Sequence, residues 1–271
     1  MIISPLLRTL LVSALLLAPS SSYAAATCGS ASFENWLGDV RTEAAGKGIS
    51  QRAIDAALNG VTLDNTVLTR DRGQQVFQQS FEQFSGRMVP PRLLRGSDML
   101  KRYGSVLGRI EAQYGVPGPV LVAIWGLETD YGVNTGKFPT IRSLVTLAYD
   151  CRRADMFRGE LLDALRIVDR GDLTPTEMRG AWAGELGQTQ FMPSSYLKFA
   201  VDFDANGRRD LLHSAPDVLA STANYLASYG WKRDQDFAPG TANFAVIQQW
   251  NKSDVYARTI AAFASQLAKA P

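Results

Sequence analysis

Val120-Leu-Val-Ala-Ile-Trp-Gly-Leu-Glu128 is the most apolar helical stretch of the chain, and Thr129-Asp-Tyr-Gly132 directly after it predicts the end of that helix. Glu128 is the only carboxylate within the stretch. A carboxyl group in such surroundings loses hydration, so its pKa should rise and a proton should stay on it near neutral pH. A general acid needs this property. On spacing alone, the alternative is a paired or snorkelling glutamate at a helix end.

Composition sets broad limits on the function. The 271 residues are 46% hydrophobic, which is enough to bury a core in one or two domains. The net charge is only +2, and no run of Lys and Arg stands out. This argues against nucleic acid as the main partner. A mild positive bias suits a polyanionic substrate without establishing one.

The N-terminus predicts an export signal over residues 1–26. Arg8 is followed by the short apolar segment Thr9–Pro19 and by the small residues Ser21–Ala26, where cleavage after Ala24 or Ala26 is expected. The segment is short for a transmembrane span, although a retained anchor is the alternative. Thr27 before Cys28 argues against a lipid-attachment site. We therefore expect a periplasmic or exported protein, without a lipid anchor and without a transmembrane segment after cleavage.

The expected mature chain, residues 27–271, contains two cysteines, Cys28 and Cys151. In an oxidising compartment, two cysteines in one domain most simply form a disulfide. Such a bond would close a long loop and stabilise the fold by about 4–5 kcal/mol in the chain-entropy view. Two free buried thiols are the alternative.

Helical periodicity dominates the chain and predicts a mainly α fold with at most a short β element. Asn243–Trp250 is the only segment that suggests a strand. The irregular segment Gly180–Ser195 is expected to be a functional loop over a cleft. Pro90-Pro91 should end the helical run at residues 76–84. Helices are expected over residues 33–44, 50–60, 76–84, 97–114, 120–129, 157–170, 214–229 and 255–268.

Several catalytic chemistries are excluded by the residues that are missing. The only histidine is His213, so an H-E-x-x-H zinc site is impossible and no Cys/His cluster can form. There is no G-x-S-x-G elbow, no P-loop and no G-x-G-x-x-G motif. Acid–base chemistry by carboxylates, assisted by amides and tyrosines, is what remains.

Residues 202–213 resemble an EF-hand calcium loop, with oxygen ligands at positions 1, 3, 5 and 9, a backbone carbonyl at 7 and glycine at 6. Position 12, which usually carries a bidentate Glu, is His213, and Asp217 in the next helix is a later replacement. We therefore expect a weakly bound structural calcium ion and no organic cofactor. A solvated turn is the alternative. The expected ligands are Asp202, Asp204, Asn206, the Arg208 carbonyl, Asp210 and Asp217.

Motifs in chain order, covering roughly Ser32 to Leu267, resemble those of lytic murein transglycosylases of the membrane-bound B type. Arg152-Arg153 with Phe157 and Glu160-Leu161 adds a weaker match. The principal matches are Ala123-Ile-Trp-Gly-Leu-Glu-Thr129 with Tyr131-Gly132, Gly180-Ala-Trp-Ala-Gly184 with Gly187-Gln-Thr-Gln-Phe-Met-Pro-Ser-Ser-Tyr196, and Ala200-Val-Asp-Phe-Asp204 with Ala223-Asn-Tyr-Leu226 and Gly230-Trp231.

The resemblance implies a single lysozyme-like helical domain with a cleft for peptidoglycan glycan strands. Enzymes of this family cut the β-1,4 bond between N-acetylmuramic acid and N-acetylglucosamine and leave a 1,6-anhydro end. Glu128 matches their single general acid/base. The implied substrate contacts are Gln190, Tyr225, Tyr131, Phe191, Met192, Trp250 and Asn251. Trp250 stands where an aromatic residue, often Tyr, is usual.

Two residues depart from the family pattern. Ala181 replaces a loop serine that would be expected to hydrogen-bond the catalytic carboxyl, and Glu185 replaces a small residue. Glu185 either points to solvent or approaches Glu128 and raises its pKa as a like charge. We expect it to point to solvent.

Three other functions are compatible with the residues. A lysozyme-type muramidase on the same fold would use water in place of the muramyl 6-hydroxyl. A non-catalytic peptidoglycan-binding protein would bind without turnover. An exported calcium-dependent structural protein would need Glu128 only for stability.

Overall fold

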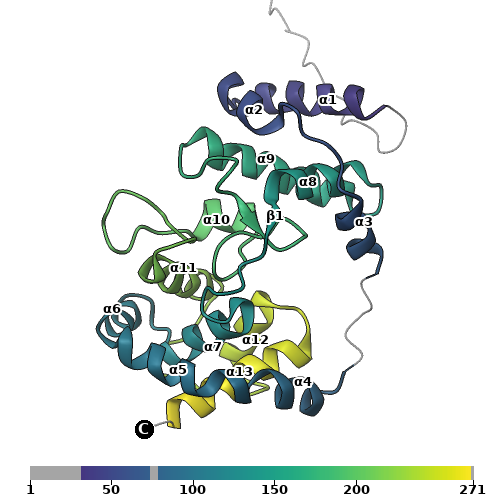
Figure 1. Ribbon diagram of the computed structural model, residues 1–271. Helices are drawn as coiled ribbons and strands as arrows, with labels where there is room; N and C mark the ends of the chain where they lie inside the picture. Colours follow the sequence, from purple (N-terminus) through teal and green to yellow (C-terminus); the bar gives the residue numbers. More distant parts are fainter. Residues whose placement is uncertain (1–31, 74–78, 270–271) are drawn as a thin grey trace, which may run out of the picture.

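The computed structural model describes residues 32–73 and 79–269. Within these ranges the chain is mainly helical, with one two-stranded antiparallel sheet that pairs Phe138 with Gly180 and Pro139 with Arg179 (Figure 1). The elements are α1 Phe33–Gly46, α2 Gln51–Leu58, α3 Asn65–Arg72, α4 Phe81–Met88, α5 Pro90–Arg102, α6 Gly104–Tyr114, α7 Gly118–Thr129, β1 Phe138–Pro139, α8 Thr140–Tyr149, α9 Ala154–Asp169, β2 Arg179–Gly180, α10 Pro193–Phe199, α11 Ala215–Ser228, α12 Ala242–Trp250 and α13 Asp254–Lys269.

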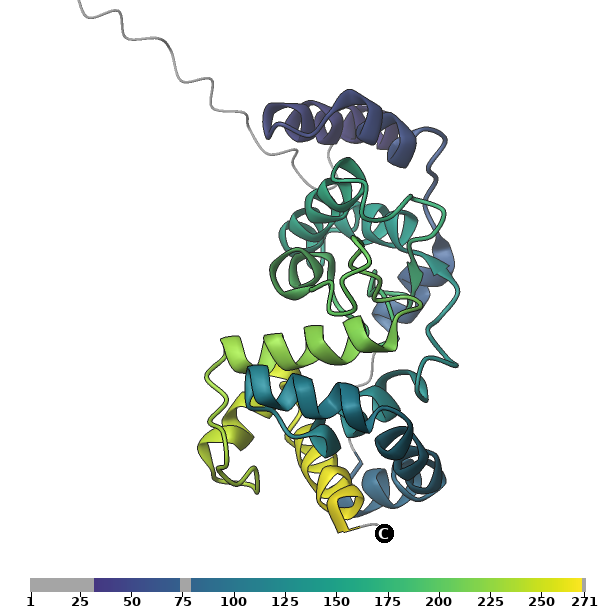
Figure 2. The ribbon, with the colours of Figure 1, turned by 90° about the vertical axis from the view of Figure 1, so that its left-hand side faces the viewer.

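The helices form two groups. In Figure 1 the upper group contains α1, α2, α3, α8, α9 and α10, and the lower group contains α4 to α7, α12 and α13. Helix α11 lies between the groups, as Figure 2 shows, and it contacts α10 on one side and α6, α7 and α12 on the other. The long loop between β2 and α10 lies beside it, so the site described below forms where the two groups meet.

Helix α7 is the centre of the lower group and packs against α5, α6, α11 and α13. Val120 to Leu127 and Thr129 are all buried. A helix that is apolar around its whole circumference is stable only when neighbours cover every face. The helix ends at Asp130, whose left-handed backbone (φ 52°) lets its N–H donate to the carbonyl of Gly126 at 3.0 Å.

Two glycines make room for Tyr131 directly after this helix end. A Cβ atom on either Gly96 of α5 or Gly126 of α7 would lie 2.7 Å from the Tyr131 hydroxyl. The hydroxyl donates to the carbonyl of Arg92 at 2.8 Å, and the ring packs edge-on against Trp125. Tyr131 therefore locks the end of α7 against α5, which fixes the direction in which the last turn of α7 points.

The expected mainly α fold is confirmed, and serine residues cap the first two helices. The side chains of Ser32 and Ser50 accept hydrogen bonds from the N–H groups of Asn35 and Ala53, both at 3.3 Å. The loop prediction for Gly180–Ser195 holds from Ala181 to Met192, because Gly180 belongs to β2 and α10 begins at Pro193. Residues 1–26, Cys28 and part of the stripe at residues 76–84 lie outside the described residues.

Two predictions of secondary structure are wrong. The segment Asn243–Trp250 is helical, because Thr241 caps the helix and accepts from the N–H of Phe244 at 3.2 Å. The expected helix 97–114 is two helices that meet at Tyr103, and Pro90-Pro91 begins the first one. Proline suits the first turn of a helix, where its missing N–H costs nothing. Among the described helices, none is both long and apolar enough to cross a membrane.

Candidate active site

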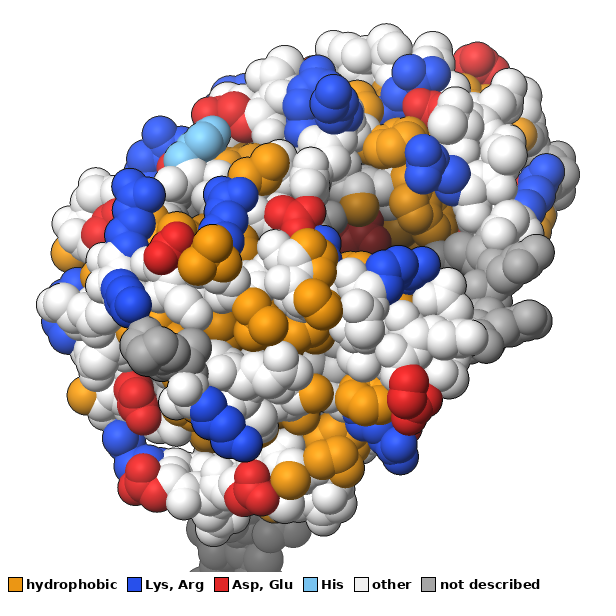
Figure 3. Space-filling view, turned by 60° about the horizontal axis from the view of Figure 1, so that its bottom comes forward, with side chains coloured by type: hydrophobic (Ala, Val, Ile, Leu, Met, Phe, Trp, Pro, Cys, Tyr) orange, Lys and Arg blue, Asp and Glu red, His pale blue; other side chains and the backbone are white. Residues whose placement is uncertain are grey.

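A pocket of about 330 Å³ lies between α7, the 180–195 loop, α11 and α12. Figure 3 shows a face of the molecule with a deep hollow, in which an acidic side chain is recessed beside hydrophobic side chains and Lys and Arg side chains stand around the rim. The pocket gathers every substrate-contact residue predicted from the sequence except Tyr131, together with Glu128. Its lining is Glu128, Glu185, Thr189, Gln190, Phe191, Met192, Ser195, Tyr225, Trp250 and Asn251.

Glu128 lines this pocket from the last turn of α7. It is the only residue between Val120 and Thr129 that is not fully buried, so its carboxyl is surrounded by protein yet opens into the pocket. Trp250 Nε1 donates to Glu128 Oε1 at 2.9 Å, and the Tyr256 hydroxyl also hydrogen-bonds this carboxyl. Burial raises the pKa of Glu128 from 4.5 to about 7, despite the opposing effect of the two hydrogen bonds. The pKa of Glu128 is therefore raised, as the sequence predicted, and burial is the cause.

Glu185 is the second carboxylate of the pocket, and the expectation that it points to solvent is wrong. It lines the same pocket as Glu128, and its charge raises the pKa of Glu128. The backbone explains this orientation, because Glu185 Oε2 accepts from the N–H of Ala183 at 3.0 Å and the side chain is thereby folded back over its own loop. Burial also raises the pKa of the Glu185 carboxyl.

The loop that carries Glu185 is fastened to α7 through Gln188. The Gln188 side chain accepts from Trp125 Nε1 at 2.9 Å and donates to the carbonyl of Leu212 at 2.8 Å. Thr129 Oγ1 donates to the backbone carbonyl of Gln188 at 2.5 Å. A Cβ atom on Gly132 would lie 2.3 Å from the Gln188 side-chain oxygen, so glycine is required for this approach. These contacts hold the loop against α7, the helix that carries Glu128.

Gln190 and Phe191 lie at the turn of this loop. Leu186 and Phe191 form an antiparallel bridge that closes the turn, and Gln190 takes a left-handed backbone conformation with φ 54°. Gln190 Nε2 donates to the carbonyls of Gly187 and Thr135 at 2.7 and 3.1 Å. Both amide protons are thus used within the protein, and the side-chain oxygen is the group left to accept from a ligand in the pocket.

Aromatic side chains from the loop, α11 and the end of α12 also line the pocket. The Trp250 ring lies 5.4 Å from the ring of Phe191 and 5.0 Å from that of Tyr225, centroid to centroid. The Tyr225 hydroxyl donates to the carbonyl of Gln249 at 2.8 Å, which ties α11 to α12. Aromatic surfaces of this kind suit the apolar faces of sugar rings, and the carboxyl and amide groups suit their hydroxyl and acetamido groups.

The structure places Tyr131 elsewhere and adds residues that the sequence did not indicate. Tyr131 is 5% exposed and packs between α5 and α7, so the predicted substrate contact is corrected to a role in positioning α7. Thr189 and Ser195 line the pocket, and Tyr256 reaches Glu128 from α13. Thr189 and Ser195 lie inside the motif loop that the sequence flagged, whereas Tyr256 carries no local signal, because only the packing of α13 on α7 brings it there.

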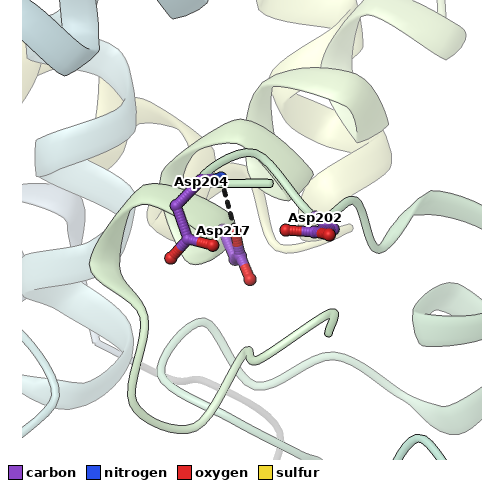
Figure 4. Close-up of side chains that lie close together, drawn as sticks. All are labelled: Asp202, Asp204 and Asp217. Atoms are coloured by element: carbon purple, nitrogen blue, oxygen red, sulfur yellow. Dashed lines mark hydrogen bonds between the residues drawn. The ribbon is translucent and has the colours of Figure 1, made fainter. Parts of the chain in front are cut away.

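The predicted metal loop brings together only part of its expected ligand set. Figure 4 shows Asp204 and Asp217 side by side, with Asp202 next to them, and one oxygen from each lies within 4.8 Å of the others. Asp210 is not in this group, and its side chain accepts from the N–H groups of Leu212 and His213 at 3.0 and 2.8 Å. The Asn206 side chain accepts from the N–H of Arg208 at 2.9 Å.

The site is therefore an aromatic-lined pocket in a helical protein, with a recessed carboxyl group whose pKa lies near neutral pH. The sequence family described as transglycosylase SLT domain matches residues 32–241. The chain belongs to this family. Its expected fold, a lysozyme-like helical domain, is accordingly confirmed.

Individual relatives agree with this assignment. The chain is 37% identical over 150 residues to the membrane-bound lytic murein transglycosylase B of Escherichia coli, a match that covers 55% of this chain and 41% of that relative. It is also similar to SltB3 from Pseudomonas aeruginosa, solved in complex with NAG-anhNAM-pentapeptide. That similarity has a TM-score of 0.82 and 32% identity over 88% of this chain and 80% of that one. The E. coli lytic transglycosylase Slt35, solved in complex with calcium, has the same fold, with a TM-score of 0.76 and 24% identity over 86% of this chain and 92% of that one.

Proposed function

We propose that this protein is a peptidoglycan lytic transglycosylase that cleaves the bond between N-acetylmuramic acid and N-acetylglucosamine and forms 1,6-anhydro-muramyl ends. The observation that carries the proposal is Glu128, a carboxyl group with a pKa of about 7 in an aromatic-lined pocket. Membership of the transglycosylase SLT family supports it, as does the likeness to SltB3, which was solved with a NAG-anhNAM-pentapeptide.

The first step needs an acid. Protonated Glu128 gives its proton to the bridging oxygen, the bond from the muramyl C1 to that oxygen breaks, and the N-acetylglucosamine end leaves with a free 4-hydroxyl. The acetamido group of the muramyl sugar stabilises the positive charge that develops at C1. A pKa near the working pH is best for a group that must donate and then accept a proton.

The second step uses the same residue as a base. Ionised Glu128 takes the proton of the muramyl 6-hydroxyl while the 6-oxygen of the sugar bonds to C1. This closes the anhydro ring and restores protonated Glu128. No water is consumed. Most glycosidases need a second carboxylate because they must activate water or form a glycosyl-enzyme, whereas here the nucleophile belongs to the substrate.

The proposed substrate contacts follow from the pocket. Gln190 offers its side-chain oxygen to sugar N–H or hydroxyl groups, and Phe191, Met192, Tyr225 and Trp250 offer apolar surface. Asn251 adds an amide at the end of α12. We assign peptidoglycan glycan strands as the partner.

Digestion of purified sacculi, followed by mass spectrometry of the products, tests the proposal. We expect muropeptides with anhydro ends from the wild-type protein and none from Glu128→Gln. A folded Glu128→Gln variant that keeps substantial activity would overturn the role of Glu128. Binding of sacculi by the wild-type protein without any release of muropeptides would mean a non-catalytic binding protein.

Glu185 favours a second candidate, a lysozyme-type muramidase. A second carboxylate in the pocket could activate water for attack on C1 while Glu128 protonates the leaving oxygen. Reducing ends in the same digest, lost in Glu185→Gln, would identify that reaction. Exclusive anhydro ends would reject it.

We also propose that residues 202–217 hold a structural calcium ion. The donor chemistry fits a hard cation, because the three clustered side chains, Asp202, Asp204 and Asp217, are all carboxylates. Asp217 is fully buried, and its pKa is raised by burial and further by the charge of Asp204. A cation would offset that repulsion, and Asn206, Asp210 and the Arg208 carbonyl would join the set when bound.

For the remainder of the chain we propose export through residues 1–26 without lipid attachment, a single lysozyme-like domain over residues 27–271, and a disulfide between Cys28 and Cys151. Mass spectrometry of the mature protein with and without reduction would reveal the cleavage site and a change of two hydrogen masses.

A further inference from the structure

We propose that the indole N–H of Trp250 orients the Glu128 carboxyl and confines its transferable proton to Oε2. Trp250 is then a positioning residue as well as part of the aromatic lining of the pocket. The role of Glu128 in this inference rests on the proposed function, whereas the hydrogen bond itself does not.

The hydrogen bond is held by rigid surroundings. Trp250 Nε1 lies 2.9 Å from Glu128 Oε1, and the indole ring packs against Phe191 and Tyr225. Tyr225 is in turn fixed through its hydroxyl to the carbonyl of Gln249, the residue before Trp250. The indole is therefore held between the loop and α11, with its N–H directed at the carboxyl.

Position 181 of the loop, where the family pattern has a serine expected to hydrogen-bond the catalytic carboxyl, is Ala181 in this chain. This position therefore offers no hydroxyl to Glu128. Among the described residues, the side chains that hydrogen-bond the Glu128 carboxyl are Trp250 at the end of α12 and Tyr256 on α13. The hydrogen-bond donors that orient Glu128 therefore come from the C-terminal helices, of which α13 packs on both α7 and α12.

An indole differs from a hydroxyl in a way that matters for proton transfer. An indole N–H can only donate, whereas a serine or tyrosine hydroxyl can donate or accept. Glu128 Oε1 therefore faces a donor in both ionisation states and cannot direct a proton toward Trp250. When Glu128 is protonated, the proton therefore sits on Oε2, the oxygen that does not accept from the indole N–H. Trp250 thus selects one oxygen for the acid step.

Titration of the indole N–H by nuclear magnetic resonance tests the hydrogen bond without reference to activity. The chain has five tryptophans. We expect one ¹H–¹⁵N indole signal, identified by its absence in Trp250→Phe, to shift with a midpoint of about 7, the pKa of Glu128. The shift should vanish in Glu128→Gln. The facing titratable groups are Glu185 and Tyr256, so the midpoint should also move in Glu185→Gln but the titration should persist.

Trp231 provides the matched control. Its indole N–H is buried and has no hydrogen-bond partner among the described residues, so its signal should not follow the ionisation of Glu128. A Trp250 signal that does not titrate, or that still titrates in Glu128→Gln, would overturn the proposal whatever the enzyme's reaction is.

Kinetics test the positioning role. Trp250→Phe keeps an aromatic ring but loses the donor, and we expect kcat to fall on the order of 10²-fold while KM stays close to that of the wild type. The pH profile should also move to higher pH, because the lost N–H no longer stabilises the ionised carboxyl. Trp231→Phe should retain wild-type kcat. A Trp250→Phe variant with only KM raised would assign Trp250 to substrate contact alone and reject the positioning role.

Discussion

Ionisation of the buried Glu128 carboxyl is expected to lower the free energy of unfolding as pH rises above 4.5. Replacing Glu128 should reveal the size of this penalty. The pKa of this carboxyl in the folded protein is about 7, against an ordinary value of 4.5. Below pH 4.5 the carboxyl is protonated in both the folded and the unfolded chain, so it has no effect. As pH rises from 4.5 to 7, the unfolded chain loses this proton and the folded chain keeps it. The penalty therefore grows through this window and is constant above it.

The size of the penalty follows from the same two values. At pH 8, burying the carboxyl costs about 3 kcal/mol, and at pH 5 it costs less than about 1 kcal/mol. Glu128→Gln has nearly the same shape, keeps an oxygen that can accept from Trp250, and cannot ionise. We expect it to be inactive and yet more stable than the wild type at pH 8, by about 3 kcal/mol, with a much smaller gain at pH 5.

Urea unfolding of both proteins at pH 5 and pH 8, followed by circular dichroism, measures this difference. Glu34→Gln, at an exposed position on α1, is the control for removing a negative charge and should change stability little at either pH. An equal stability difference between Glu128→Gln and the wild type at the two pH values would show that the carboxyl is not held protonated, and would refute the reasoning.

Three further outcomes are expected. Glu185→Gln removes a like charge, so the pKa of Glu128 should fall and the alkaline limb of the pH–rate profile should move to lower pH. Glu177→Gln, at an exposed position, is the control and should leave the profile unchanged. Gly126→Ala would place a Cβ 2.7 Å from the Tyr131 hydroxyl and should lower stability by about 1–3 kcal/mol in thermal or urea unfolding. Gly108→Ala is the control, because its Cβ meets nothing within 4 Å on an exposed helix face, and it should raise stability by about 1 kcal/mol. Calcium at about 100 times its Kd should stabilise the fold by about 2.7 kcal/mol, and Asp202→Asn with Asp204→Asn should abolish this gain in calorimetry.

Much of the fold follows from local patterns. The caps at Ser32 and Ser50 and the periodicity of the long helices are properties of short segments, so they could be predicted before any packing was known. The error at Asn243–Trp250 has a tertiary component. Asn243 is fully buried, and its side chain bonds the backbone of Lys232 and Gln235, an environment that local alternation does not reveal.

The candidate site divides in the same way. The sequence alone predicted that Glu128 ends an apolar helical segment that must be buried, because a helix that is apolar on every face needs neighbours around it. The motif loop likewise determined which residues would lie near it. Only the tertiary structure decided that Glu185 turns inward, that Tyr131 is a wedge behind α7, and that Trp250 and Tyr256 reach the carboxyl from the C-terminal helices. Those contacts join residues up to 128 positions apart in sequence, as Glu128 and Tyr256 are, and their geometry is set by helix packing that no local pattern encodes.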